Sequence, residues 1–162
     1  MEATKTPRVK ICCISSLEEA RLAVAAGAAA LGLVGDMPSG PGIISDALIQ
    51  EIASATPPPV ATFLLTSETS AAGIIQHHRR VCTSTVQVVD ALAEGTYKEI
   101  RQALPGIKIV QVIHVIDDQS VEEAISLAPQ VDALLLDSGN PHLAVKELGG
   151  TGRVHNWELS KK

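Results

Sequence analysis

The chain has 162 residues, of which 46% are apolar, 19% charged and 2% aromatic, as expected for one soluble domain (1–162) with an aliphatic core. Its 13 Lys and Arg against 18 Asp and Glu give a formal net charge of −5. Because the chain has no basic run and little aromatic surface, we expect no nucleic-acid partner.

Neither membrane nor secretory signals are evident. No apolar stretch reaches the roughly 18 residues that a membrane-spanning helix needs, so we expect no membrane partner. The opening MEATKTPRVKI has no apolar signal-peptide core. The three cysteines, Cys12, Cys13 and Cys82, are an odd number without metal-ligand spacing. We therefore predict reduced thiols in a cytoplasmic protein.

Apolar runs alternate with helical patterns along the chain. Expected strands cover 9–14, 30–35, 60–65, 85–89, 107–115 and 131–136. Helices are predicted after each strand, beginning at Ser16 (with Glu19 in a capping box, and Gly27 ending the helix), at Ser45, at Ser67 or Ser70, near Tyr97, at Ser120 (with Glu123), and at Asn156. This rhythm predicts an α/β fold with a parallel sheet covered by helices.

Two architectures suit such a chain, an open doubly wound sheet and a closed (β/α)₈ barrel. The first strand is followed by SSLEEA and not by the G-x-G-x-x-G of dinucleotide-binding folds. Periodicity alone leaves both architectures open.

In both architectures the chemistry lies at the carboxyl ends of the strands. Candidate residues there are Cys12, Cys13, Asp36, Gln87, Asp90, Gln111, His114, Asp137 and Ser138, followed by the loop Gly149, Gly150, Thr151, Gly152. A thiol and a carboxylate facing each other can remove and donate protons, although Cys12 also fits a core position and Asp137 a turn. The glycine loop suits an anion such as phosphate, or is an ordinary flexible loop.

The histidines give weaker signals. His114 fits a buried core position, whereas His77 and His78 are predicted to be solvated on a helix surface. No histidine or acidic cluster has metal-ligand spacing, so no metal site is expected.

Four motifs stand out along the chain: V-K-I-C at 9–12, A-x-x-A-G-A-x-A-L-G-L-V at 23–34, L-L-L-D-S at 134–138 and G-G-T-G-R-x-H-N-W at 149–157. Together they resemble the phosphoribosylanthranilate isomerase family of tryptophan biosynthesis. The resemblance implies a (β/α)₈ TIM-barrel fold, here with about six parallel strands present and the last two βα units absent. It implies the Amadori rearrangement of N-(5′-phosphoribosyl)anthranilate to the 1-deoxyribulose 5-phosphate derivative, without cofactor or metal.

The resemblance also assigns roles. Cys12 is the implied general base and Asp137 the implied general acid, and Lys10, Gln87, Gly149, Gly150, Thr151 and Gly152 are the implied substrate-binding residues. Such chemistry calls for a lowered pKa of the Cys12 thiol and a raised pKa of the Asp137 carboxyl.

The sequence departs from the family pattern in places. Cys13 replaces the usual Gly, the loop 39–42 lacks the usual Arg, and the strand at 85–89 lacks the usual His. Two alternatives therefore stay open: a non-catalytic phosphometabolite-binding or assembly fragment of the barrel, and an isomerase for a related phosphosugar. Open sheet edges also predict possible homo-oligomers.

Overall fold

The computed structural model describes residues 7–162 and contains one six-stranded parallel sheet. Residues 1–6, which belong to the stretch used above to assess a signal peptide, lie outside the described part. The elements in chain order are β1 (Lys10–Ile11), α1 (Leu17–Ala25), β2 (Ala30–Val34), α2 (Asp46–Ala55), β3 (Ala61–Thr66), α3 (Ala71–Val81), β4 (Thr85–Val88), α4 (Tyr97–Ala103), β5 (Lys108–His114), α5 (Asp118–Leu127), a 3₁₀ turn (Ala128–Gln130), β6 (Ala133–Asp137) and α6 (Trp157–Ser160).

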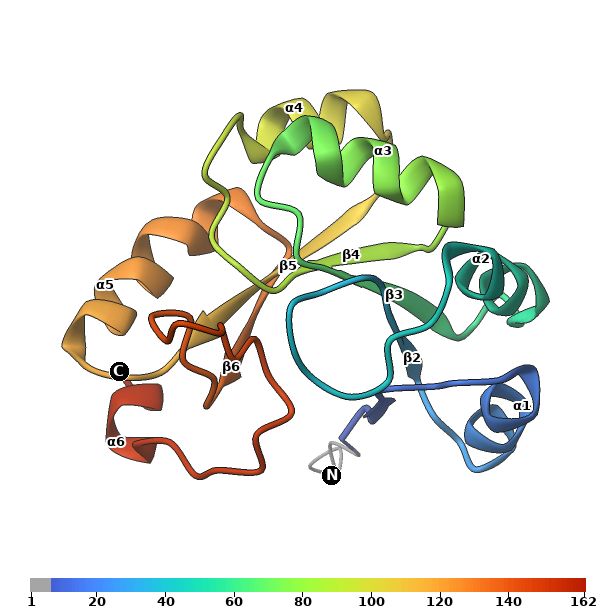
Figure 1. The fold of residues 1–162 in the computed structure, drawn as a ribbon, viewed down its shortest axis with the longest axis horizontal. Helices are drawn as coiled ribbons and strands as arrows, with labels where there is room; N and C mark the ends of the chain where they lie inside the picture. The colour runs from blue at the N-terminus through green and yellow to red at the C-terminus, as the bar shows by residue number, and fades with distance from the viewer. Residues whose placement is uncertain (1–6) are drawn as a thin grey trace, which may run out of the picture.

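The strands follow one another in sequence order, β1-β2-β3-β4-β5-β6, and each neighbouring pair is parallel. A doubly wound sheet reverses its strand order at a switch point, so this topology excludes that alternative. Figure 1 shows the sheet curled, with α1 to α5 around its outside. The architecture is therefore of the barrel type with β1 and β6 as its two edges, as predicted.

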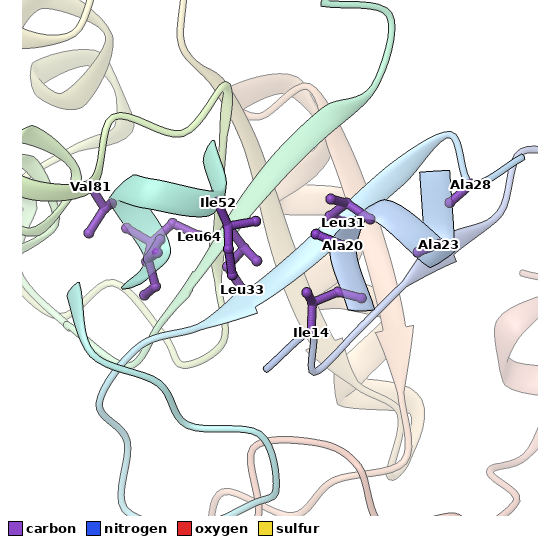
Figure 2. Close-up of a cluster of buried hydrophobic side chains, with 10 residues drawn as sticks. Ile14, Ala20, Ala23, Ala28, Leu31, Leu33, Ile52, Leu64 and Val81 are labelled. Carbon is purple, nitrogen blue, oxygen red and sulfur yellow. The ribbon is translucent and has the colours of Figure 1, made fainter. Parts of the chain in front are cut away.

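Successive side chains along each strand point to opposite sides of the sheet, so the sheet has an outer face toward the helices and an inner face. On β2, Leu31 and Leu33 are fully buried against the helices. Figure 2 shows them among Ala20 of α1, Ile52 of α2 and other side chains of the same cluster. Because the outer face carries the hydrophobic core, the inner face is left for polar residues and a cavity.

Most predicted helix starts are confirmed by side-chain hydrogen bonds. The hydroxyl oxygens of Ser16, Ser45 and Ser70 each accept the N–H three residues further on. The prediction that Ser120 begins a helix is wrong: Asp117 is the N-cap of α5, and its carboxylate accepts the Gln119 N–H at 2.9 Å. The N-cap of this helix thus lies three residues earlier than predicted.

The first strand is shorter than predicted. Cys13 has φ = 59°, a left-handed conformation that strands do not adopt. The strand therefore ends at Ile11, and β1 keeps only two residues.

The segment after β6, residues 138–156, folds back against the inner face of the sheet. Leu148 is buried there in a cluster with Val34, Leu65, Val89 and Val112. The Ser39 hydroxyl in the loop after β2 donates to the Lys146 carbonyl. Figure 1 shows this segment, coloured orange to red, between β6 and α6. It gives the inner face a wall that the strands alone do not supply.

Within residues 7–162, every helix is too short or too polar to cross a membrane.

Candidate active site

A cavity of about 260 Å³ lies at the carboxyl ends of the strands. Strands β1, β4 and β6 contribute to it, together with the loops that follow β2 and β6. Its lining includes Lys10, Cys12, Gln87, Asp137, Gly149 and Gly150, and an apolar remainder with Met37, Pro41, Leu135 and Leu148. The cavity thus brings together most of the residues predicted from the sequence.

The two-residue period of the strands explains why these polar side chains share one face. Val86 and Val88 of β4 lie in the core, whereas Gln87 between them faces the cavity. On β1, the Lys10 ammonium group donates a hydrogen bond of 2.6 Å to the Gln87 side-chain oxygen. The same ammonium lies 5.0 Å from the centre of the Phe63 ring.

Lys10 places a cation close to both thiols of the cavity. Burial lowers the pKa of Lys10, and the nearby thiols of Cys12 and Cys13 oppose this shift. An ammonium beside a thiol favours the thiolate form, which is the nucleophilic and basic form of cysteine. The arrangement therefore suits proton removal by a cysteine.

Cys12 lies next to a glycine that leaves room for it. A Cβ atom at Gly32 of β2 would stand 2.7 Å from the Cys12 Sγ and 3.1 Å from its Cα. The neighbouring Cys13 thiol lies 3.6 Å from the Pro41 carbonyl oxygen. Burial and the Cys12 thiol raise the pKa of Cys13, so Cys13 is less readily ionised.

Asp137 ends β6 and is half-buried in the cavity. Its Oδ2 accepts the Gly139 N–H at 2.6 Å and lies 3.5 Å from the Nδ1 of His114. The interaction with His114 lowers the pKa of Asp137; burial works against this, and the Gly139 and Ser138 amides add to it. The prediction of a raised Asp137 pKa is thus wrong, because donors surround the carboxylate.

The glycine loop contributes only its first half to the cavity. Gly149 and Gly150 line it, with φ values of 138° and 67° that favour glycine. Thr151 is hydrogen-bonded through its hydroxyl to Ser138 at 2.9 Å and does not line the cavity. Gly152 lies outside the cavity, and a Cβ there would meet open space.

Two histidines have environments that differ from the predictions. His77 is buried and not solvated: its Nδ1 lies 2.9 Å from the Thr66 hydroxyl and its Nε2 lies 3.0 Å from Asp46. His114 is buried as predicted, but it also stands beside Asp137 in the register of β5 and β6. Its position at a strand end had already made it one of the candidate residues in the sequence.

Other residues of the site carried no signal in the sequence. Met37, Ser39 and Leu148 line or close the cavity because the loops after β2 and β6 meet over the sheet. Contacts between loops so far apart in the chain do not follow from local patterns. Within residues 7–162 there is no group of three or more His, Cys, Asp or Glu side chains arranged to hold a metal ion.

Comparison with known proteins agrees with the geometry, although no family model matches the chain. N-(5′-phosphoribosyl)anthranilate isomerase 2 of Methanosarcina mazei is 31% identical, over 96% of this chain and 68% of that protein. The Halobacterium salinarum N-(5′-phosphoribosyl)anthranilate isomerase is 34% identical, over 95% of this chain and 68% of that protein.

A solved structure is similar over the same extent. Phosphoribosyl anthranilate isomerase from Thermotoga maritima aligns with a TM-score of 0.72 and 26% identity, covering 95% of this chain and 70% of that one. A further structure of such an isomerase, in complex with reduced 1-(o-carboxyphenylamino)-1-deoxyribulose 5-phosphate, aligns with a TM-score of 0.66 and 26% identity, covering 82% and 65%.

Fold and site together define a TIM-barrel-type α/β protein with a thiol and a carboxylate in one cavity at its strand ends. The relatives narrow this class to a single group of enzymes. The chain belongs to the phosphoribosylanthranilate isomerase family.

Proposed function

We propose that the chain catalyses the Amadori rearrangement of N-(5′-phosphoribosyl)anthranilate to 1-(2-carboxyphenylamino)-1-deoxyribulose 5-phosphate. The observation that carries this proposal is the single cavity lined by both Cys12 and Asp137. An isomerisation of this kind needs one group that donates a proton and one that removes a proton. These two side chains can fill both roles, with no step that calls for a metal or an organic cofactor.

Asp137 acts in the first step. It donates a proton to the ribose ring oxygen, and the bond between that oxygen and C1′ breaks. The lone pair of the anthranilate nitrogen then forms a double bond to C1′, which gives an open-chain Schiff base. The proton must be available near neutral pH, although the pKa of Asp137 is lowered.

Cys12 acts in the second step. As a thiolate it removes the proton from C2′, and the electron pair of that bond forms the double bond of an enolamine. Tautomerisation to the ketone completes the rearrangement. The Lys10 ammonium lines the same cavity.

The remaining wall of the cavity suits the two ends of the substrate. Backbone N–H groups of a glycine loop can approach a phosphate closely, and we assign this role to Gly149 and Gly150, with Thr151 and Gly152 continuing the loop. Met37 and Leu148 offer apolar surface for the anthranilate ring. Lys10 and Gln87 complete the binding residues.

The test is turnover of N-(5′-phosphoribosyl)anthranilate by the purified chain beside its C12S variant. We expect C12S to lose about 100-fold or more in kcat, the range for a lost general base. C82S is the matched control, because Cys82 is exposed and lies outside the cavity. Equal activity of C12S and C82S would refute the role of Cys12.

Two additional measurements on the same chain decide between the alternatives left open by the sequence. A folded chain that binds reduced 1-(o-carboxyphenylamino)-1-deoxyribulose 5-phosphate but turns over no substrate would be a non-catalytic binding or assembly form of the barrel. Turnover of another phosphosugar, and not of N-(5′-phosphoribosyl)anthranilate, would assign the chain as an isomerase for a related substrate.

The open sheet edges support a proposal on assembly. β6 carries Leu136 with 40% exposure, and β1 carries Ile11 with 41%. Exposed strand edges with apolar side chains favour pairing with another chain. We therefore propose homo-oligomers through these edges, to be tested by sedimentation velocity across a range of concentrations; a monomer at every concentration would refute them.

A required free thiol at Cys12 suits a reducing compartment, which supports the cytoplasm as the location.

A further inference from the structure

The acid proposed above stands beside a buried histidine. The His114 side chain is only 8% exposed, and its ring lies between the ends of β4 and β6. Asp137 and His114 are direct neighbours in the register of the sheet. Their closest atoms, Oδ2 and Nδ1, are 3.5 Å apart, which is an ion-pair distance and long for a hydrogen bond.

The tautomer of His114 follows from its other nitrogen. Nε2 lies 3.0 Å from the Val89 carbonyl oxygen, and a carbonyl can only accept a hydrogen bond. Nε2 therefore carries a hydrogen. A neutral ring then has a bare lone pair on Nδ1, which is buried and has no hydrogen-bond partner among residues 7–162.

That lone pair faces a carboxylate oxygen. Two lone pairs opposed at this distance repel each other, and a buried unpaired acceptor costs free energy. One proton removes both problems, either as an imidazolium next to a carboxylate or as a carboxylic acid donating to a neutral ring. The geometry thus favours a state in which His114 and Asp137 together hold one proton.

Gly139 makes the close approach possible. A Cβ atom at this position would stand 2.7 Å from the His114 Nδ1 and 2.9 Å from the Asp137 Oδ2. Any side chain here would therefore enter the space between the two groups. The Gly139 N–H also donates to Oδ2 and fixes its orientation.

The remaining polar and charged groups around His114 favour its cationic form. Asp90, which follows β4, faces the ring and pairs with Lys146 from the loop after β6. On the side of α5, Ser120 donates to the His114 backbone carbonyl. Burial lowers the pKa of His114, but the interactions with Asp137 and Val89 and the charge of Asp90 outweigh burial and raise it.

His114 also lines a second cavity, of about 500 Å³, on the α5 side of the site. Asp90, Asp117, Glu123, His142 and Lys146 line it as well. The histidine therefore separates this polar cavity from the one that contains Asp137.

We propose that His114 is a positioning residue of the acid, and that it and Asp137 hold one shared proton which Asp137 delivers to the substrate. The role in turnover rests on the proposed function. The proton passes to the ribose ring oxygen as its bond to C1′ breaks, which leaves a carboxylate and a neutral ring. When the ketone forms, the Cys12 thiol returns its proton to C1′ and the C2′ hydroxyl releases a proton, which the pair regains. This explains how a carboxyl group with a lowered pKa serves as an acid near neutral pH, since the proton belongs to the pair.

The pair is tested first without any turnover. Nitrogen-15 NMR of the histidine rings, with His114 assigned through an H114Q variant, reports the tautomer and the titration. We expect His114 to titrate above the ordinary value of about 6.5, and to titrate about 1 unit or more lower in D137N. A His114 titration that is unaffected by D137N would overturn the proposal.

Turnover then tests the role in the reaction. H114Q can keep a side-chain N–H for the Val89 carbonyl, but it has no nitrogen that titrates. We expect kcat at pH 7.5 to fall about 100-fold with little change in KM, and the basic limb of the kcat profile to move to lower pH. A purely structural role would lower activity at every pH and leave the limb in place, which would refute the proposal.

The two tests separate this proposal from the proposed function. Active protein without a coupled His114–Asp137 titration refutes the pair and keeps the isomerase. A coupled titration in a chain without turnover refutes the isomerase activity and keeps the proton-sharing pair.

Discussion

Replacing Gly32 by alanine tests how the Cys12 thiol, the proposed general base, is placed. Gly32 lies on the inner face of β2, and the added Cβ would stand 2.7 Å from the Cys12 Sγ and 3.1 Å from its Cα. The thiol can rotate away, but the Cα belongs to the backbone that directly follows β1. The strand edge must therefore move by several tenths of an ångström.

The expected cost follows from two opposing effects. Overpacking of a tight contact destabilises by about 1–3 kcal/mol. Removing a strand glycine returns about 0.5–1 kcal/mol through the entropy of the unfolded chain. We therefore expect G32A to lower the free energy of unfolding by about 1–2 kcal/mol, or a few degrees in Tm. A thiol displaced by up to 1 Å should also cost about 100-fold in kcat/KM.

The matched control is the same substitution in a helix. A Cβ at Gly73 in α3 would meet the Glu68 carboxylate, the far end of a flexible side chain, and would stand 2.9 Å from the Ser70 hydroxyl that caps the helix. The Glu68 side chain can swing away and alanine is the better helix former, whereas the cap hydroxyl must shift slightly. We therefore expect G73A to change the free energy of unfolding by no more than about 1 kcal/mol and to leave kcat/KM unchanged. Urea unfolding and steady-state kinetics of both variants provide the test. If G32A is as stable and active as the unmodified chain, the reasoning on Cys12 placement is refuted.

Two further predictions concern stability. H77A leaves the buried Thr66 hydroxyl and the Asp46 carboxylate without their histidine partner. We therefore expect the free energy of unfolding, measured with urea, to fall by about 2–4 kcal/mol. A fall below about 0.5 kcal/mol, the size of an ordinary surface substitution, would contradict the role of His77. Burial raises the pKa of Asp132, but the hydrogen bond from the Ile109 N–H and nearby cations outweigh burial and lower it. The contribution of Asp132 to stability is present above its unfolded-state pKa of about 3.9 and is lost as the pH falls through its lower folded-state pKa. The Tm of D132N should therefore fall less steeply at acid pH than the Tm of the unmodified chain. An equally steep fall in both proteins would contradict this.

Local patterns predict the elements of this fold well. Apolar runs predicted every strand, and a serine or asparagine before a helical pattern predicted most helix starts, because both signals act over a few residues. The exceptions are also local. Asp117 competes with Ser120 as a cap three residues away, and the left-handed conformation of Cys13 shortens β1.

The sequence predicted only those site residues that lie at the ends of strands. Cys12, Gln87 and Asp137 lie in the cavity because parallel strands place their carboxyl ends at one edge of the sheet. The environments of His77 and His114 were not predictable, since their partners come from segments 31 and 25 residues away, respectively. Burial and ionisation depend on such partners and not on the residue type.

The chemistry of the site depends on contacts between the two ends of the sheet. Cys12 is on the β1 edge and Asp137 on the β6 edge, and these strands do not pair with each other. The segment after β6 bridges them, since Gly150 packs beside Pro41, and Leu148 packs against the inner face. This segment also carries Lys146, which holds Asp90 next to His114. The same loop therefore closes the cavity and sets the charges around the shared proton, so that changes in the loop should alter acidity and substrate binding together.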